Sequence, residues 1–433
     1  MNRIRCGARS GGIVFSGAAI RGMGVVMSNV SVPELELFEL AQALVDAPSP
    51  NPPGDVRLPL EVAAEYLAKN GISFTRVSCD RDYRKVNLVA RVYGAHPGPH
   101  LVMNAHLDVF PPSTARKAVE EGRRSAEADD GARVIRGRGA VDMKGGAAAF
   151  MVALKVLNER RQRLHGQVTL CLVCDEEVFG PWGSRALLEM FPDLYGDALL
   201  SSEPSSTSVI RIGERGFVWG TVEFSGEGGH GAYPSGKPSP IERASACVRD
   251  LRSAIPEASK LEDSEPGGKM SHSLLAPVGK SFVDTVSLNF GTIGGGITVN
   301  MKADNCRVGL DIRVPLGKST DEIVKLVHEV VARHDGSFRV DNSSEPNKSD
   351  QSARLFSLMK AAVERVTGKT PAFAIGLGCT DARLWRRRGI PAAVFGPDPS
   401  TMAHGDEKVG LSELSEVANV HLQTALQFLG EDT

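Results

Sequence analysis

Acidic and histidine side chains stand directly after three short apolar runs, at 101–105, 167–174 and 199–202, that have the length of buried strands. The side chains that follow these runs are His106, Asp108, Asp175, Glu176, Glu177 and Glu203. Asp142 adds a carboxylate in a glycine-rich turn, and His404 stands in a late loop. Because open parallel sheets form their sites outside the carboxyl ends of the strands, we expect these groups to converge.

Imidazole and carboxylate groups are the ligands that zinc prefers, and cobalt or manganese can occupy similar sites. Two ions about 3.5–4 Å apart need a bridging carboxylate, and hydrolysis needs one further acid, unligated, as a base. A single histidine or one acidic pair at a strand end is more often a capping or surface group. The whole set together favours a metal-dependent hydrolase. Histidines that lack this context are expected to be surface or packing residues: His96, His100, His165, His272, His328, His334 and His421.

Strands alternate with helices over most of the chain. Continuous apolar runs indicate strands that are covered on both faces, and an apolar helix pattern at 145–159 separates two of them. This order predicts an α/β fold with a doubly wound, mostly parallel sheet. Beyond Arg215 the order becomes strand–helix–strand–strand–helix–strand, which is typical of a small α+β two-layer domain. We therefore predict a catalytic domain at 31–214 and 343–433, with a smaller lid and dimerisation domain inserted at 215–342.

Composition limits the possible functions. A chain of 433 residues suits about two domains, and its net charge of −2 argues against nucleic-acid binding. No apolar run reaches about 18 residues, so no membrane span is expected. The seven cysteines are scattered and odd in number, which favours reduced thiols in the cytoplasm. Residues 1–30 are basic and contain no acid, so we expect a disordered leader, with an organellar transit peptide as the alternative.

The pattern of strand-end residues resembles the M20 metallopeptidase family, which includes acetylornithine deacetylase, succinyl-diaminopimelate desuccinylase, aminoacylase-1 and the glutamate carboxypeptidases. The resemblance covers residues 33–430 and implies two divalent metal ions, with zinc expected and cobalt or manganese possible. It places His106 and Glu203 on the first ion and Glu177 and His404 on the second. Asp142 bridges both ions, and the family implies a cis peptide bond between Asp142 and Met143.

The resemblance also implies catalytic roles. Asp108 orients His106, and Glu176 is the general base that takes a proton from a metal-bridging water and returns it to the leaving amine. His230, in a glycine-rich stretch at 228–234, resembles the family histidine that stabilises the oxyanion. In the family this histidine reaches across a homodimer, so we expect His230 to act on the partner's site.

Substrate recognition is implied less directly. Asn300, Arg313, Thr380 and Arg383 match positions where the family holds a substrate carboxylate, although a lone arginine such as Arg313 is more often a strand-edge charge. Two departures stand out. A charged stretch at 116–130 replaces an aromatic segment that is common in the family. The spacing from His404 to Glu407 is one residue shorter than the commoner pattern.

The leading hypothesis is hydrolysis of an amide bond in an N-acyl amino acid, by a deacetylase or desuccinylase. A carboxypeptidase or dipeptidase that acts on a short peptide is the main alternative, because it uses the same metal centre. A carbamoyl-amide hydrolase is disfavoured, because those enzymes place a histidine where this chain has Glu203. A catalytically inactive binding homologue would have lost a ligand or Glu176, and this sequence keeps all of them.

Overall fold

The computed structural model describes residues 30–78, 83–111, 128–129, 132–233, 236–255 and 284–431. The leader expected at 1–30 lies outside the described residues apart from Val30, and so does the charged stretch apart from the backbone of 128–129. The α-helices are α1 (Glu34–Asp46), α2 (Arg57–Lys69), α3 (Lys144–Glu159), α4 (Ser184–Met190), α5 (Pro240–Ala254), α6 (Thr320–Ala332), α7 (Arg354–Thr367), α8 (Ala382–Arg386) and α9 (Leu411–Leu429).

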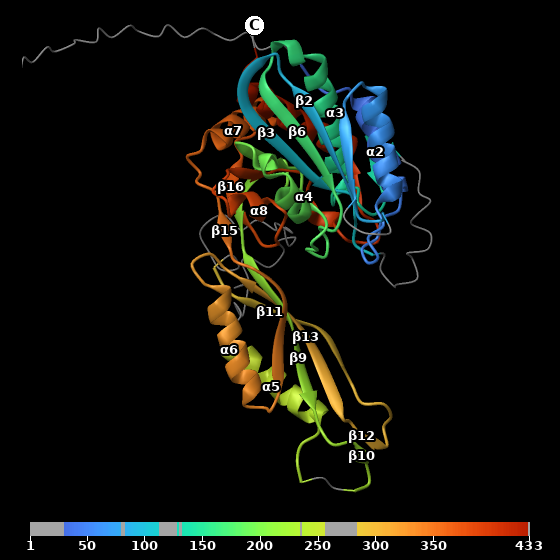
Figure 1. The fold of residues 1–433 in the computed structure, drawn as a ribbon, viewed down its shortest axis with the longest axis vertical. Helices are drawn as coiled ribbons and strands as arrows, with labels where there is room; N and C mark the ends of the chain where they lie inside the picture. The colour runs from blue at the N-terminus through green and yellow to red at the C-terminus, as the bar shows by residue number, and fades with distance from the viewer. Residues whose placement is uncertain are drawn as a thin grey trace, which may run out of the picture. The chain divides into compact units, whose positions relative to one another are not determined.

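A mostly parallel sheet forms the centre of the larger part of the molecule (Figure 1). Its strands are β1 (Phe74–Ser78), β2 (Val86–Tyr93), β3 (His96–His106), β6 (His165–Val173), β7 (Ala198–Ser201), β8 (Val209–Glu214), β15 (Asn347–Lys348), β16 (Ala372–Gly376) and β17 (Ala392–Val394). Their order is β1-β2-β6-β3-β7-β17-β8-β15, and β16 pairs with β8. The central pairs β6–β3, β3–β7 and β7–β17 are parallel, while β1 and β2 add antiparallel edges. The predicted α/β fold class is confirmed.

Helices cover both faces of this sheet, which explains the continuous apolar strands. Helix α3 is buried on nearly every side from Lys144 to Leu154, because it lies between the sheet and the helices α1 and α9. On the opposite face, Leu187 of α4 and Trp385 of α8 pack against buried side chains of β2, β3, β6 and β7. The strand β8 was not anticipated, because Arg211 and Gly213 interrupt its apolar pattern.

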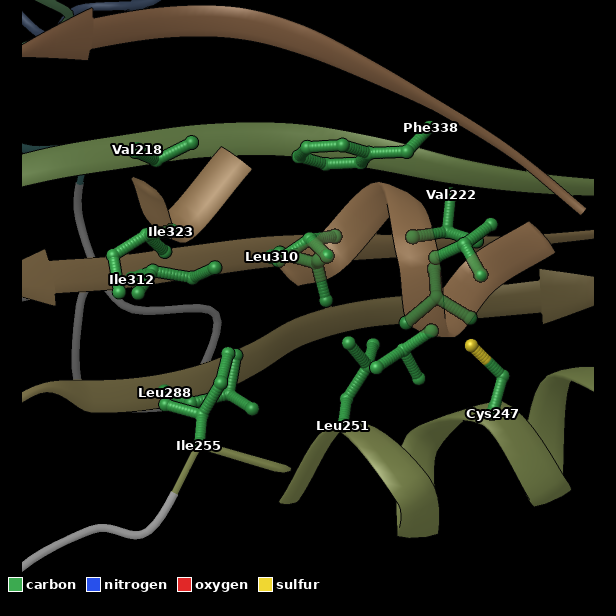
Figure 2. Close-up of a cluster of buried hydrophobic side chains, with 14 of the residues drawn as sticks. Val218, Val222, Cys247, Leu251, Ile255, Leu288, Leu310, Ile312, Ile323 and Phe338 are labelled. Carbon is green, nitrogen blue, oxygen red and sulfur yellow. The ribbon is translucent and has the colours of Figure 1, made fainter. Parts of the chain in front are cut away.

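A second, antiparallel sheet with the order β11-β13-β9-β14 forms the smaller domain. Its elements are β9 (Gly216–Ser225), β11 (Ser287–Gly295), β13 (Asn305–Val314) and β14 (Ser337–Ser344), with the short pair β10 (Gly229–His230) and β12 (Met301–Lys302). Alternate residues of β9 and β13 point to α5 and α6 and form one apolar core (Figure 2). Ser239 and Glu242 form a capping box that fixes the start of α5. The domain boundaries at 215 and 342 remain a prediction.

A short third sheet joins two distant parts of the sequence. Its strand β18 (Lys408–Gly410) pairs antiparallel with β5 (Ala132–Arg136), which in turn pairs with β4 (Ala128–Asp129). The pairing brings the loop that carries His404 next to the turn that carries Asp142. Among the described helices, none has the length and apolar character needed to cross a membrane.

Candidate metal centre

Three neighbouring strands deliver the predicted ligands to one edge of the larger sheet. Strand β3 ends at His106, β6 ends three residues before Glu176, and β7 ends two residues before Glu203. These strands are adjacent and parallel in the order β6-β3-β7, so their carboxyl ends coincide. The convergence that we expected from the sequence therefore follows from the strand order.

His106, Asp142 and Glu203 form a compact buried group whose candidate ligand atoms all lie within 4.8 Å of one another. The Nε2 atom of His106 lies 3.2 Å from Asp142 Oδ1 and 3.5 Å from Glu203 Oε1. The other ring nitrogen, Nδ1, is hydrogen-bonded to the main-chain oxygen of Asp108 at 2.8 Å. This arrangement leaves Nε2 facing the two carboxylates, as a metal-binding histidine requires.

Several carboxyl groups compete for the same buried space. Burial and the charge of Glu203 raise the pKa of Glu176 well above its usual value, and burial with the charge of Asp142 does the same for Glu177 and Glu203. Burial lowers the pKa of His106, but the hydrogen bond to Asp142 and the charge of Glu203 outweigh it, so that pKa is raised. Among the described residues, the buried Oε1 of Glu176 accepts no hydrogen bond. Divalent cations would neutralise this excess of negative charge, so the residues present fit a metal centre.

The carboxylate of Asp108 fastens the strand-end loops together. It accepts hydrogen bonds from the main-chain N–H of Glu176 at 3.2 Å and of Glu177 at 3.1 Å. Asn51 donates its side-chain amide to the same carboxylate at 2.8 Å. The contact with His106 differs from the expectation, because Asp108 Oδ1 lies 3.7 Å from His106 Nδ1 and the main-chain oxygen takes the closer place. Sequence reasoning missed Asn51, whose only signal was its position in a proline-rich turn.

Glu407 holds the turn that carries Asp142. Its Oε1 accepts main-chain hydrogen bonds from Gly139, Val141 and Asp142 at 3.0, 3.0 and 3.1 Å, and Arg138 pairs with Oε2 at 2.7 Å. The peptide bond between Asp142 and Met143 is cis, as the resemblance implied. Glu407 therefore lies inside the turn, whereas His404, three residues before it, is exposed.

The two predicted ligands of a second ion are less closely gathered. Glu177 is half-buried, and its Oε1 accepts the main-chain N–H of Phe110 at 3.0 Å. His404 lies outside the compact group, in the exposed part of its loop, where its main-chain N–H donates to Thr401 O at 3.1 Å. The structure therefore brings together His106, Asp142 and Glu203, and the role of His404 stays a prediction.

One of the predicted substrate-binding residues, Arg383, lies near Glu176 and is hydrogen-bonded to a second one, Thr380. Arg383 is buried, with Nη1 2.6 Å from Thr380 O and 4.0 Å from Glu176 Oε1. Thr380 is hydrogen-bonded through both its N–H and its hydroxyl to Glu214, which also pairs with Arg386 at 2.9 Å. The hydroxyl of Thr380 is therefore engaged within the protein.

The other two candidates and His230 belong to the smaller domain. His230 and Asn300 are neighbours, because Gly231 donates its N–H to Asn300 O at 2.8 Å. Both side chains are exposed, and the ring of His230 lies edge-on to Tyr233 at 5.6 Å. Arg313 is paired with Asp311 at 2.8 Å, at the opposite end of the domain from His230.

Two succinyl-diaminopimelate desuccinylases are similar to this chain in sequence. Succinyl-diaminopimelate desuccinylase of Granulibacter bethesdensis is 28% identical over 411 residues, which cover 91% of this chain and 98% of the relative. The succinyl-diaminopimelate desuccinylase of Nitratiruptor sp. is 26% identical over 401 residues, which cover 91% of this chain and 100% of the relative.

Solved structures show the same fold. A tripeptidase from Staphylococcus aureus has a TM-score of 0.69 and 17% identity, covering 92% of this chain and 100% of that one. The dipeptidase Dug1p of Saccharomyces cerevisiae has a TM-score of 0.71 and 15% identity, covering 92% and 97%. A Bacillus subtilis protein described as a dinuclear metal binding peptidase has a TM-score of 0.62 and 15% identity, covering 92% and 99%.

A family model described as peptidase family M20/M25/M40 matches residues 102–427. This match spans most of the chain and includes the whole set of predicted metal ligands and Glu176. The chain is therefore a metallohydrolase that belongs to the M20/M25/M40 peptidase family.

Proposed function

We propose that this enzyme hydrolyses the amide bond of an N-acyl amino acid, as a deacetylase or desuccinylase does, with Glu176 as the general base. The observation that carries the proposal is the buried carboxylate of Glu176, whose Oε1 accepts no hydrogen bond from the described residues and whose pKa is raised by burial and by the charge of Glu203. The two desuccinylases that match this chain over nearly their whole lengths support an acyl amino acid as the substrate.

The same residues suggest how the cofactor would be held. His106 and Glu203 would bind one divalent ion, Glu177 and His404 a second, and Asp142 would lie between them, with zinc as the expected metal. When bound, such ions lower the pKa of water and polarise an amide carbonyl. Glu176 then removes the proton from the attacking water and delivers it to the leaving amine. Burial raises the pKa of Glu176, which suits a group that must carry this proton between the two steps.

A carboxylate on the substrate is the proposed target of the remaining polar groups. Arg313, Asn300, Thr380 and Arg383 are the candidates, and a guanidinium fork recognises a carboxylate through two parallel hydrogen bonds. The fork of Arg313 is now occupied by both oxygens of Asp311, at 2.8 and 2.9 Å. A substrate that binds there must therefore compete with Asp311.

We also propose a homodimer in which His230 acts on the partner's centre. Four exposed apolar side chains lie on β11, on β12 and in the segment between these two strands: Ile293, Ile297, Val299 and Met301. Large exposed apolar side chains so close together in the sequence support an interface with a second copy. His230 follows the far end of β9, whose ten residues span roughly 33 Å from its start beside the larger sheet. That distance supports action in trans. The free thiols of Cys171, Cys247, Cys306 and Cys379 support a reducing, cytoplasmic location.

A substrate panel tests the proposal. Metal-loaded protein should release amine from N-succinyl-L,L-diaminopimelate or N-acetyl amino acids faster than from dipeptides. Treatment with a chelator should abolish the activity, and added zinc, cobalt or manganese should restore it. Preferential cleavage of dipeptides would favour the carboxypeptidase or dipeptidase alternative. Metal-independent hydrolysis, or none on the whole panel, would contradict the proposal.

A further inference from the structure

Phe179, three residues after Glu176, has an unusual backbone conformation. Its φ is +49°, in the left-handed region that glycine tolerates and that bulky side chains rarely adopt. Its N–H donates to Glu176 O at 2.6 Å, and the next N–H, of Gly180, donates to Asp175 O at 2.9 Å. A strained residue of this kind persists where its surroundings fix it, and it points to a functional constraint.

Phe179 is held by three different elements, two through its ring and one through its main chain. Its ring stacks on Phe217 at 4.7 Å and on Trp219 at 5.0 Å, and both of these residues belong to β9. The guanidinium of Arg383, on α8, lies 4.5 Å from the centre of the same ring, within the range of a cation–π contact. The main-chain oxygen of Phe179 accepts the side-chain amide of Asn342, on β14, at 3.3 Å.

The two phenyl rings of this cluster are closed to a substrate. Phe179 is 7% exposed, while Phe217 and Arg383 are fully buried, so no ligand can stack on the two phenyl rings. The cluster instead extends to the proposed base, because Arg383 Nη1 lies 4.0 Å from Glu176 Oε1. Arg383 is fixed on its other side by the hydrogen bond to Thr380 O at 2.6 Å. The ring of Phe179 therefore limits where the guanidinium of Arg383 can lie.

We infer that Phe179 is a positioning residue for the general base. It anchors the turn at 175–180 to β9 and β14, where the smaller domain begins and ends, and its ring places the positive charge of Arg383 4.0 Å from Glu176 Oε1. The smaller domain therefore helps to fix the base in addition to carrying His230. This inference rests on the proposed role of Glu176.

Kinetics of three variants on N-succinyl-L,L-diaminopimelate, or on the best substrate of the panel, test the inference. Phe179→Leu keeps apolar bulk but loses the ring stacking, and we expect kcat to fall by about 10- to 100-fold with little change in KM, since a misplacement of about 1 Å can cost that much. Phe179→Tyr keeps the ring and should restore kcat to near the parental value. Phe338→Leu removes an equally buried ring (7% exposed) from the core of the smaller domain and should leave kcat nearly unchanged.

A second measurement needs no substrate. The N–H groups of Glu176, Glu177 and Phe179 are all hydrogen-bonded, so their hydrogen exchange in the metal-loaded protein reports on the turn. Phe179→Leu should speed their exchange by about tenfold or more if local opening controls it, whereas Phe338→Leu should not.

Parental kcat and parental exchange in Phe179→Leu would overturn the inference, and so would equal losses of kcat in Phe179→Leu and Phe338→Leu. Loss of kcat with unchanged exchange would overturn the anchoring of the turn. A Glu176→Gln enzyme that retains the parental rate would instead refute the proposed function, whatever the exchange data show.

Discussion

Glu407 accepts a hydrogen bond from the main-chain N–H of Asp142 at 3.1 Å, and the same oxygen serves Gly139 and Val141. Glu407→Ala would leave three buried N–H groups without an acceptor, at a cost of about 1–3 kcal/mol for each. We therefore expect a loss of several kcal/mol in the free energy of unfolding, together with weaker metal binding because Asp142 is no longer held. Urea unfolding and metal titration measure the two effects.

Glu407→Gln is the matched control for this prediction. It keeps an oxygen that can accept the three N–H groups but gives up the charge that pairs with Arg138 at 2.7 Å. We expect it to lose less stability than Glu407→Ala. Equal metal affinity in the parent and in Glu407→Ala would show that the turn does not depend on Glu407.

His421 makes stability depend on pH. Its ring is buried against Phe150 and Phe395, Nε2 donates to Phe395 O at 2.8 Å, and burial lowers its pKa to about 4. The unfolded chain takes up this proton near pH 6.5, before the folded chain does. The neutral, buried His421 therefore does not lower the free energy of unfolding above pH 6.5. As the pH falls from 6.5 toward 4, protonation of this residue in the unfolded chain lowers that free energy. With about 1.4 kcal/mol per pKa unit, the loss reaches about 3 kcal/mol.

The difference between the parent and His421→Gln isolates this effect from the other titrating groups. Urea unfolding of both proteins in a chelator, at several pH values from 7 to 4, gives the difference in free energy of unfolding. The parent should lose its advantage over the variant as the pH falls. A difference that is constant across this range would mean that His421 titrates alike in the folded and unfolded chains.

The dimer proposal makes a prediction at the edge of the smaller domain. Val299 is fully exposed and Ile297 is 79% exposed in the single chain. Replacing both with glutamate would place two charges in an apolar interface, so we expect monomers and a fall in kcat, since His230 would no longer reach a partner. Sedimentation measures the association state. The same double substitution at Leu35 and Leu58, exposed on α1 and α2, is the control and should change neither property.

Mixed dimers separate action in trans from action within one chain. His230→Ala and Glu176→Gln should each be nearly inactive. If His230 serves the partner's centre, a mixed dimer collects both lesions in one site and leaves the other intact, so activity should return when subunits exchange. No recovery after demonstrated exchange would assign His230 to its own chain or to no catalytic role.

Local patterns were sufficient to predict the central strands of the larger sheet and the convergence of the side chains that follow them, although they missed β8. Apolar runs such as 167–174 mark buried strands, and parallel strands bring their carboxyl ends together, which is why Glu176 and Glu203 could be placed beside His106. The resemblance to the M20 family supplied what spacing could not, including the cis bond after Asp142.

Contacts between distant segments could not be predicted in this way. Asn51 lies 57 positions before Asp108, and no periodic pattern links the two residues. Phe179 follows Glu176 closely in sequence, but no glycine marks its left-handed backbone, and no periodic pattern links it to Phe217, on which it stacks. Likewise, the sequence did not indicate that His404 would be exposed while Glu407 entered the turn of Asp142.

The central claim is that Glu176 supplies base catalysis at a metal centre that forms without it. Glu176→Gln keeps the size of the side chain and removes its ability to accept a proton. We predict a metal content equal to that of the parent, measured by atomic spectrometry, with kcat lowered by at least about 10²- to 10⁴-fold on the same preparation. A variant that keeps both its metal and the parental kcat would contradict the account.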